Sequence, residues 1–238
     1  MKYEIVHISE TDSTNRWLME HGGEVDTVVW TDYQTAGRGC GTNQWESQRG
    51  ENLLFSMLIH PQTLEARCQF RISIAISLAI IDALSPITPH PSFLTIKWPN
   101  DIYWGNRKLG GILIENKLSG QHIRQSIIGV GLNVNQTMFE SDAPNPVSLR
   151  QITGHEHDRE QLLAAVLETF PADLSTVNDS RYRSLLYRRE GYHPYRDAQG
   201  TFEARLINVE DDGHLLLCDR EGHERRYAFK EVQFTLAS

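Results

Sequence analysis

The sequence reads Lys-Trp-Pro-Asn-Asp at residues 97–101 and Lys-Leu-Gly-Gly-Ile-Leu-Ile-Glu at residues 108–115. The proline predicts a tight turn between β-prone segments, and paired glycines let a main chain approach a ligand closely. Lysines provide compact charges for phosphate, and a carboxylate can bind the accompanying Mg²⁺. The stretch therefore suits an anionic, metal-bound ligand resting on backbone, although two surface strands joined by a charged hairpin could have the same composition.

A glycine-rich segment at residues 34–47 is the second informative stretch. Three of its residues between 37 and 41 are glycines, which predicts a loop because glycines bring no side chains to a core. Arg38 could bind a carboxylate or phosphate with its planar guanidinium, and Trp45 could stack on a base or cap a pocket. The segment contains neither a Walker nor a Rossmann pattern, so in isolation a flexible surface connection explains it equally well.

The rest of the chain predicts an α+β fold with a mainly antiparallel sheet packed with helices. Four strands follow one another between residues 93 and 133 without a helix, which is typical of antiparallel connections. The expected strands of this part are 3–8, 27–32, 52–59, 93–97, 101–104, 108–118 and 123–133. The expected helices are 14–21, 64–84, 158–176 and 178–190, the third bent or ended by Pro171.

After Gly191 the pattern changes to short strands separated by glycine-containing turns. The expected strands are 192–197, 201–209, 214–219, 225–230 and 232–236. We therefore expect two domains, residues 1–190 and residues 191–238. So short a second domain buries little core alone, which predicts that it docks on the first.

Composition excludes several classes of function. The net charge of −8 argues against nucleic-acid binding, which needs a basic face. Cys40, Cys68 and Cys218 are scattered, which fits a reducing cytoplasm and offers no metal spacing. No apolar signal region begins the chain, and the apolar run 72–84 is too short to span a bilayer. We expect a cytoplasmic protein without membrane or nucleic-acid partners.

Five segments, in this order and at these separations, closely resemble the biotin–protein ligases. They are Ser13-Thr14-Asn15, Gln34 with Gly37-Arg38-Gly39 and Trp45, Lys97-Trp98-Pro99-Asn100-Asp101, Lys108-Leu109-Gly110-Gly111-Ile112, and Gly129-Val130-Gly131-Leu132-Asn133-Val134-Asn135. That family joins biotin to ATP, giving biotinyl-5′-adenylate and pyrophosphate. It then passes the biotinyl group to one lysine of a biotin carboxyl carrier domain.

The resemblance implies a class II synthetase-like catalytic domain followed by a small SH3-like β-barrel. It implies biotin and ATP as substrates, Mg²⁺ as the accompanying ion, and a carrier domain of a biotin-dependent carboxylase as partner. Because the first strand starts near residue 3, we expect a monofunctional ligase without an N-terminal DNA-binding domain. Whether it is a monomer or a homodimer stays open.

The resemblance also implies roles for individual residues. Lys108 is expected to contact the biotin carboxylate, the phosphate or both, Lys97 a phosphate, and Arg38 the reacting centre from the other side. These three are the expected catalytic residues, and Asp101 is the expected Mg²⁺ ligand. The implied biotin-binding residues are Ser13, Thr14, Asn15, Gln34, Gly37, Arg38, Gly39, Lys108, Gly110, Gly111, Gly129 and Gly131. The implied nucleotide-binding residues are Arg38, Trp45, Lys97, Asn100 and Asn133.

Several of these residues have a second interpretation. Ser13, beside Asp12, could be only a helix cap, and Glu115 could be solvated or could support Lys108. Trp98 is assigned to the core without a ligand role. Cys40 stands where many relatives carry a second arginine, and no histidine base is placed beside it, so we do not expect a nucleophile.

Two other functions compete with biotin ligation. A lipoate–protein ligase shares the fold and the adenylate chemistry, but residues 97–101 and the loop ending in Trp45 favour biotin. A non-catalytic biotin-binding protein would have no use for the phosphate ligands Lys97 and Lys108. A panel of substrates would separate biotin ligation from lipoate ligation, and pyrophosphate release on adding biotin and Mg-ATP would separate a biotin ligase from a non-catalytic biotin-binding protein.

Overall fold

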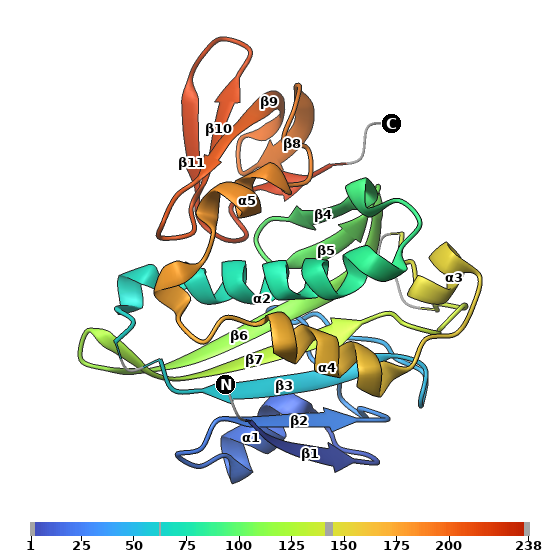
Figure 1. Ribbon diagram of the computed structural model, residues 1–238. Coiled ribbons are helices and arrows are strands. Elements are labelled where there is room, and N and C mark those ends of the chain that lie inside the picture. Colours follow the sequence, from blue (N-terminus) through green and yellow to red (C-terminus); the bar gives the residue numbers. More distant parts are fainter. Residues whose placement is uncertain (1–2, 62, 141–144, 236–238) are drawn as a thin grey trace.

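The computed structural model describes residues 3–61, 63–140 and 145–235, and its larger part is built on one seven-stranded sheet (Figure 1). The strand order is β1-β2-β3-β7-β6-β5-β4, and β1–β2 is the parallel pair among otherwise antiparallel neighbours. The predicted α+β fold with a mainly antiparallel sheet is confirmed. The strands are β1 (Glu4–Ile8), β2 (Thr27–Thr31), β3 (Leu53–Ile59), β4 (Leu94–Lys97), β5 (Asp101–Trp104), β6 (Arg107–Ser119) and β7 (His122–Leu132).

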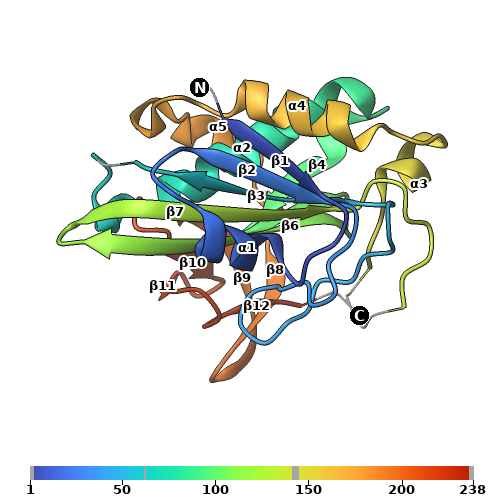
Figure 2. The same ribbon diagram turned by 90° about the horizontal axis from the view of Figure 1, so that it is seen from below.

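The two faces of this sheet are covered unequally. Helices α2 (Phe70–Leu84) and α4 (Arg159–Thr169) cover one face, and α1 (Thr14–His21) lies on the other (Figure 2). Neighbouring residues of β2 show the alternation, since Val28 belongs to the large core and Val29 packs with Leu18 of α1. Helix α1 makes its main sheet contacts with β2, β3 and β7. Helix α1 therefore does not cover the β5–β6 side of this face, and other segments of the chain can pack there.

Helix α2 is the central packing helix that the sequence predicts. Together with the 3₁₀ turns Ala66–Cys68 and Ser85–Ile87 it forms a helical run, Ala66–Ile87, with the length and mean hydropathy (1.7) of a membrane span. This run is longer than the apolar stretch 72–84 because the two turns extend it. Yet 67% of its apolar window is buried inside the protein, as expected for the core helix of a globular domain.

The chain after α2 departs from the predicted helix bounds. Helix α4 ends at Thr169, just before Phe170 and Pro171, as the proline predicts. The helix predicted at 178–190 is wrong beyond α5 (Asp179–Ser184). There Ile96 of β4 donates to the Leu185 carbonyl (2.8 Å) and accepts from the Tyr187 amide (2.9 Å).

Helix α3 (Leu149–Thr153) was not predicted. Ser148 and Gln151 form a capping box at its first turn, in which each side chain accepts from the other residue's backbone amide. The box stabilises a helix too short to show an apolar period.

The C-terminal part forms a second, five-stranded sheet with the order β11-β10-β9-β8-β12. It docks beside α2, where the Trp98 indole donates to the Gly213 carbonyl (2.8 Å) and meets the Phe229 ring edge-on. Residue 236, at the end of the last expected strand, lies outside the described residues. The SH3-like character and the boundary at residue 191 stay predictions. The strands are β8 (His193–Asp197), β9 (Gly200–Val209), β10 (Leu215–Asp219), β11 (Glu224–Tyr227) and β12 (Gln233–Phe234).

Candidate active site

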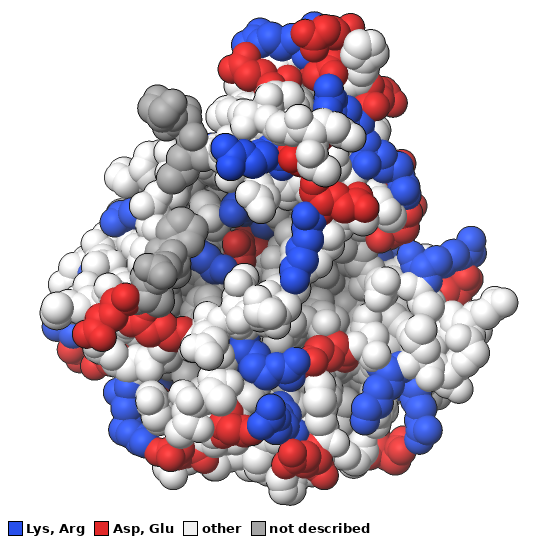
Figure 3. Space-filling view, turned by 180° about the vertical axis from the view of Figure 1, so that it is seen from behind, with Lys and Arg blue, Asp and Glu red and all other residues white. Residues whose placement is uncertain are grey.

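A pocket of about 690 Å³ lies on the sheet face that α1 covers only in part. The sheet forms its floor, and its walls are completed by residues 38–40 and 42–45 of the glycine-rich loop and by residues 229–230 and 232–234 of the C-terminal part. Figure 3 shows this side of the molecule, hollowed between the two parts of the chain and edged with basic side chains. The predicted site residues that line it are Ser13, Thr14, Asn15, Gln34, Arg38, Gly39, Trp45, Lys97, Asn100, Asp101, Lys108, Gly111, Gly129 and Gly131.

One end of the pocket is a network of uncharged polar groups. Gln34 Oε1 accepts from the Thr14 amide (2.8 Å) and the Thr14 hydroxyl (3.1 Å). Ser56 Oγ lies 2.7 Å from Thr14 Oγ1 and 2.6 Å from Asn15 Oδ1. These side chains come from α1, β3 and the start of the glycine-rich loop, so three separate segments fix each other's orientation.

Ser13 lies at the same neutral end of the pocket, and its contacts decide whether it acts only as a helix cap. It occupies the N-cap position of α1, but its side chain makes no capping hydrogen bond, and Asp12 Oδ1 instead accepts from the Ser13 amide (2.6 Å). The Ser13 side chain is buried and lines the pocket. Its hydroxyl is therefore available to a ligand.

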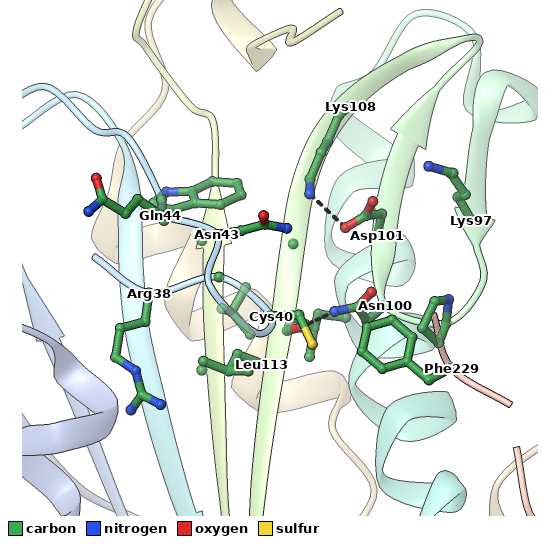
Figure 4. A pocket seen from close by; sticks show the side chains of 18 of the residues that line it. Arg38, Cys40, Asn43, Gln44, Lys97, Asn100, Asp101, Lys108, Leu113 and Phe229 are labelled. Atoms are coloured by element: carbon green, nitrogen blue, oxygen red, sulfur yellow. Dashed lines mark hydrogen bonds and ion pairs between the residues drawn. The ribbon is translucent and has the colours of Figure 1, made fainter. Parts of the chain in front are cut away.

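The other end of the pocket is ionic (Figure 4). Lys108 Nζ lies 2.7 Å from Asp101 Oδ1 and 5.6 Å from the centre of the Trp45 ring. Lys97 Nζ donates to the Tyr103 hydroxyl (3.2 Å) and stands 5.5 Å from the centre of the Phe234 ring. Burial lowers the pKa of Lys97, and Asp101 offsets part of that effect. An anion entering here would meet two lysines on separate strands.

Two glycines form a platform for Trp45. Gly111 of β6 and Gly131 of β7 are direct partners in the sheet. A Cβ on Gly131 would lie 2.4 Å from Trp45 Cε2, and one on Gly111 would lie 3.1 Å from Trp45 Cζ3. The indole therefore packs on bare backbone, where only glycine leaves enough room. Half-buried Trp45 also lines the pocket, so it presents part of its ring to a ligand.

Arg38 is held by a partner that the sequence left uncertain. Its guanidinium donates to both carboxylate oxygens of Glu115, at 3.0 and 3.3 Å, and the Asn15 amide donates to the same carboxylate at 2.7 Å. Figure 4 shows Arg38 pointing away from Lys108. Glu115 thus supports Arg38 and Asn15, and the interpretation that it supports Lys108 is wrong, since Asp101 is the carboxylate paired with that lysine.

Three predicted residues do not line the pocket. Gly37 lies under the loop backbone, where a Cβ would be 2.5 Å from the Trp45 carbonyl, and Gly110 faces Leu132 on the core side. Asn133 is buried, and its amide donates to the carbonyls of Lys108 (3.4 Å) and Val147 (3.1 Å). In this structure these residues support the walls, and their ligand contacts stay predictions.

Comparisons with known proteins place this pocket in a known family. The sequence pattern of the biotin/lipoate A/B protein ligase family matches residues 8–133, more than half of the chain and the part that holds most of the lining residues. The chain belongs to this family. The predicted resemblance to the biotin–protein ligases is confirmed.

Individual members of the family match over most of the chain. The bifunctional ligase/repressor BirA of Bacillus spizizenii is 31% identical, covering 93% of this chain and 70% of that protein. The biotin–[acetyl-CoA-carboxylase] ligase of Paracoccus denitrificans is 30% identical, covering 91% of this chain and 95% of its own. The structure of the Aquifex aeolicus biotin protein ligase in complex with biotin and ATP superposes with a TM-score of 0.79 at 26% identity, covering 98% and 99% of the two chains.

One residue that supports the pocket, Ser56, and one wall that lines it were not predicted from the sequence. Ser56 is fully buried, and its only signal is one hydroxyl in the otherwise apolar strand β3, Leu-Leu-Phe-Ser-Met-Leu-Ile. The other part is the C-terminal wall, which belongs to no motif and reaches the pocket through domain docking. Its lining residues are Phe229, Lys230, Val232, Gln233 and Phe234.

Proposed function

We propose that this protein activates biotin with Mg-ATP, forming biotinyl-5′-adenylate, and transfers the biotinyl group to a lysine of a biotin carboxyl carrier domain. The observation that carries the proposal is one pocket with a neutral hydrogen-bonding end and a cationic end. Biotin has the matching polarity, since its ureido ring is uncharged and its valerate chain ends in a carboxylate. The names of relatives that ligate biotin, and the Aquifex aeolicus complex with biotin and ATP, support it.

The neutral end suits the ureido ring. Ser13 offers a buried hydroxyl that makes no capping bond, and the Gln34–Thr14–Ser56–Asn15 network fixes the directions of the neighbouring donors and acceptors. Hydrogen bonds aligned before binding spare the ligand the cost of ordering them. Gly129 contributes close approach from the floor, because a Cβ there would lie 2.2 Å from Asn15 Oδ1.

The cationic end suits the first half-reaction. A biotin carboxylate oxygen attacks the α-phosphorus of ATP, the bond to the β-phosphate oxygen breaks, and pyrophosphate leaves. Two anions must approach, so neutralising and positioning them dominates catalysis. Lys108 lies between Asp101 and Trp45, where its ammonium can bridge both reactants, and Lys97 can hold a phosphate.

Mg²⁺ would enter with ATP as part of the substrate. Asp101 is the one carboxylate among the lining residues in the described part of the chain, and Mg²⁺ commonly uses one or two carboxylates together with substrate phosphates. The ion would neutralise phosphate charge. Asp101 would then exchange Lys108 for Mg²⁺, freeing the ammonium for the reacting anions.

The second half-reaction needs no covalent enzyme intermediate. The neutral amine of the acceptor lysine attacks the biotinyl carbonyl and loses a proton to solvent, the mixed anhydride bond breaks, and AMP leaves. Burial raises the pKa of Cys40, which keeps its sulfur as an inert thiol. The three free cysteines fit the proposal that the enzyme works in the reducing cytoplasm.

The test is biotin-dependent exchange of labelled pyrophosphate into ATP, followed by transfer of biotin to a purified carrier domain. We expect exchange with biotin and none without it, and label on the carrier lysine. Lipoate in parallel separates the competing ligase, because exchange with lipoate but not biotin would reverse the assignment. Biotin binding without exchange would leave a non-catalytic binding protein.

A further inference from the structure

Lys230 has an unusual backbone for a residue with a side chain. It follows β11 in the segment that forms the C-terminal wall, and its φ is 71°, in the left-handed region that favours glycine. In the described residues only Asn145 and Arg188 share a positive φ without being glycine. Such conformations cost free energy and concentrate at functional sites.

The side chain of Lys230 crosses from the C-terminal part to the glycine-rich loop. A Cβ on Gly41 would lie 2.1 Å from Lys230 Nζ, so the ammonium fills the space that a side chain at position 41 would need. Neighbouring Cys40 lines the same pocket as Lys230, Asp101 and Lys108. The ammonium therefore stands over the tip of the loop, at the ionic end of the pocket.

Lys230 differs from the neighbouring cations in its partners. Lys108 pairs with Asp101, and Arg38 pairs with Glu115. Within residues 3–61, 63–140 and 145–235, no carboxylate lies within 4.0 Å of Lys230 Nζ; its recorded aromatic neighbour is the Phe229 ring, 5.7 Å away. A lysine that lines a pocket without a carboxylate partner is ready to bind an anion.

The charges that line the pocket indicate how much negative charge the bound ligand carries. Among the described lining residues, Lys97, Lys108 and Lys230 stand against the one carboxylate of Asp101, and the charge of Arg38 is already balanced by Glu115. A ligand with several phosphates balances that excess, whereas the single carboxylate of biotin does not.

We propose that Lys230 is a phosphate ligand of the bound nucleotide, supplied by the C-terminal sheet. The inference rests on the proposed function for the identity of the nucleotide as ATP. It also gives the docked C-terminal sheet a direct part in substrate binding.

The experiment measures equilibrium binding of Mg-ATP and of adenosine by titration calorimetry to the full chain and its variants. Lys230→Ala should weaken Mg-ATP binding about tenfold, the value of one charge-assisted contact, and leave adenosine binding unchanged. Lys230→Arg should bind within about threefold of wild type because the charge is kept. The matched control is Lys117→Ala, an exposed lysine of β6 outside this pocket, which should bind Mg-ATP as wild type does.

Two further variants separate charge from structure. Lys230→Gly relaxes the left-handed backbone while removing the ammonium, so it should lose Mg-ATP affinity without a fall in thermal midpoint. The double variant Cys40→Arg, Lys230→Ala places a cation on the loop beside the position of the lost ammonium, and should recover most of the lost affinity. Equal Mg-ATP affinity for wild type, Lys230→Ala and Lys230→Gly would overturn the proposal, as would an equal loss for adenosine.

The experiments distinguish a failure of the proposed ligase function from a failure of the proposed Lys230–phosphate contact. If the wild type shows no biotin-dependent pyrophosphate exchange, the ligase assignment fails, while weaker Mg-ATP binding by Lys230→Ala would still establish the phosphate contact. A wild type that binds no Mg-ATP would overturn both proposals.

Discussion

The two ends of the pocket are held in different ways. At the neutral end Gln34, Thr14, Ser56 and Asn15 satisfy one another through hydrogen bonds of 2.6–3.1 Å, so the shape exists before a ligand arrives. At the ionic end the lysines rest on a carboxylate or on aromatic groups, and these partners can be exchanged for phosphate. A neutral ring is thus recognised by fixed geometry, and an anion by charges that change partners.

The largest effect should come from removing the central charge of the ionic end. Lys108→Ala should lower the rate of biotinyl-adenylate formation roughly 10²- to 10³-fold, because one donor aligned with developing charge contributes about 2–4 kcal/mol. Its matched control is Lys117→Ala on the same strand, which should retain the wild-type rate. Pyrophosphate exchange measures both, and a Lys108→Ala rate within threefold of wild type would remove Lys108 from the catalytic residues.

The next effect tests the glycine platform between the two ends. Gly131→Ala places a methyl group 2.4 Å from Trp45 Cε2, so the indole must shift. If Trp45 stacks on adenine, the KM for ATP should rise about 5- to 150-fold, since stacking on a base is worth about 1–3 kcal/mol. The KM for biotin should change less.

The control for this substitution is Gly23→Ala. A Cβ at Gly23 meets nothing within 4 Å, and no positive φ is recorded there. Both variants lose one glycine, but only one displaces the indole. Equal KM values for ATP in Gly131→Ala and Gly23→Ala would show that the position of Trp45 is irrelevant to nucleotide binding.

The ionic end was more predictable from sequence than the hydrogen-bonded network of the neutral end. Lys97, Asp101 and Lys108 lie in short motifs whose residue types match phosphate chemistry, and β4, β5 and β6 bring them together through consecutive antiparallel pairing. Ser56 is different, because a single serine in a strand has no local signal. Its partners are about 40 residues away in sequence, and only the packing of α1 on β3 makes them neighbours.

Long-range pairing also explains the errors in secondary structure. The helix predicted to continue to residue 190 yields to a bridge between Leu186 and Ile96, 90 residues apart by their numbers, which no local propensity encodes. The C-terminal wall was hidden for the same reason. Phe229 reaches the pocket through the docking of a whole sheet on Trp98, whose burial was correctly predicted.

A smaller effect should come from loosening the neutral end. Ser56→Ala leaves the Thr14 and Asn15 groups without one partner, which should lower the free energy of unfolding by about 1–3 kcal/mol. Biotin should bind about fivefold more weakly because its donors and acceptors are less well oriented, while ATP binding should not change. Chemical denaturation and biotin titration measure the two quantities.

The chain contains a matched control for this change. Ser77 of α2 is also fully buried, but its hydroxyl has no hydrogen-bond partner. Ser77→Ala should therefore cost little or stabilise the protein, and should bind biotin as wild type does. If Ser56→Ala behaves like Ser77→Ala, the neutral end is not held by this network.

The smallest effect at neutral pH concerns Lys97, and it needs a pH profile to be seen. Burial lowers the pKa of Lys97 below the usual lysine value of 10.5, so the ammonium loses its proton earlier than an exposed lysine as the pH rises. If Lys97 binds phosphate, kcat/KM for ATP should fall along an alkaline limb below pH 10.5. Lys97→Arg should retain activity within about fivefold at neutral pH and lack this limb, because arginine stays charged.

The stability of the free protein should change in the opposite direction over the same range. Between the folded and the unfolded pKa of Lys97, the unfolded chain binds more protons, so the free energy of unfolding rises with pH. This stability gain from the deprotonated, neutral Lys97 is fully present above the unfolded pKa, and it is lost as the pH falls through the folded pKa. At neutral pH the buried charge therefore destabilises the free protein, and Lys97→Met should stabilise it by roughly 0.5–2 kcal/mol. Lys97→Met should at the same time bind Mg-ATP more weakly. A Lys97→Met protein with lower stability, or a Lys97→Arg profile with the wild-type limb, would show that Lys97 is structural and that phosphate binding belongs to Lys108 and Lys230.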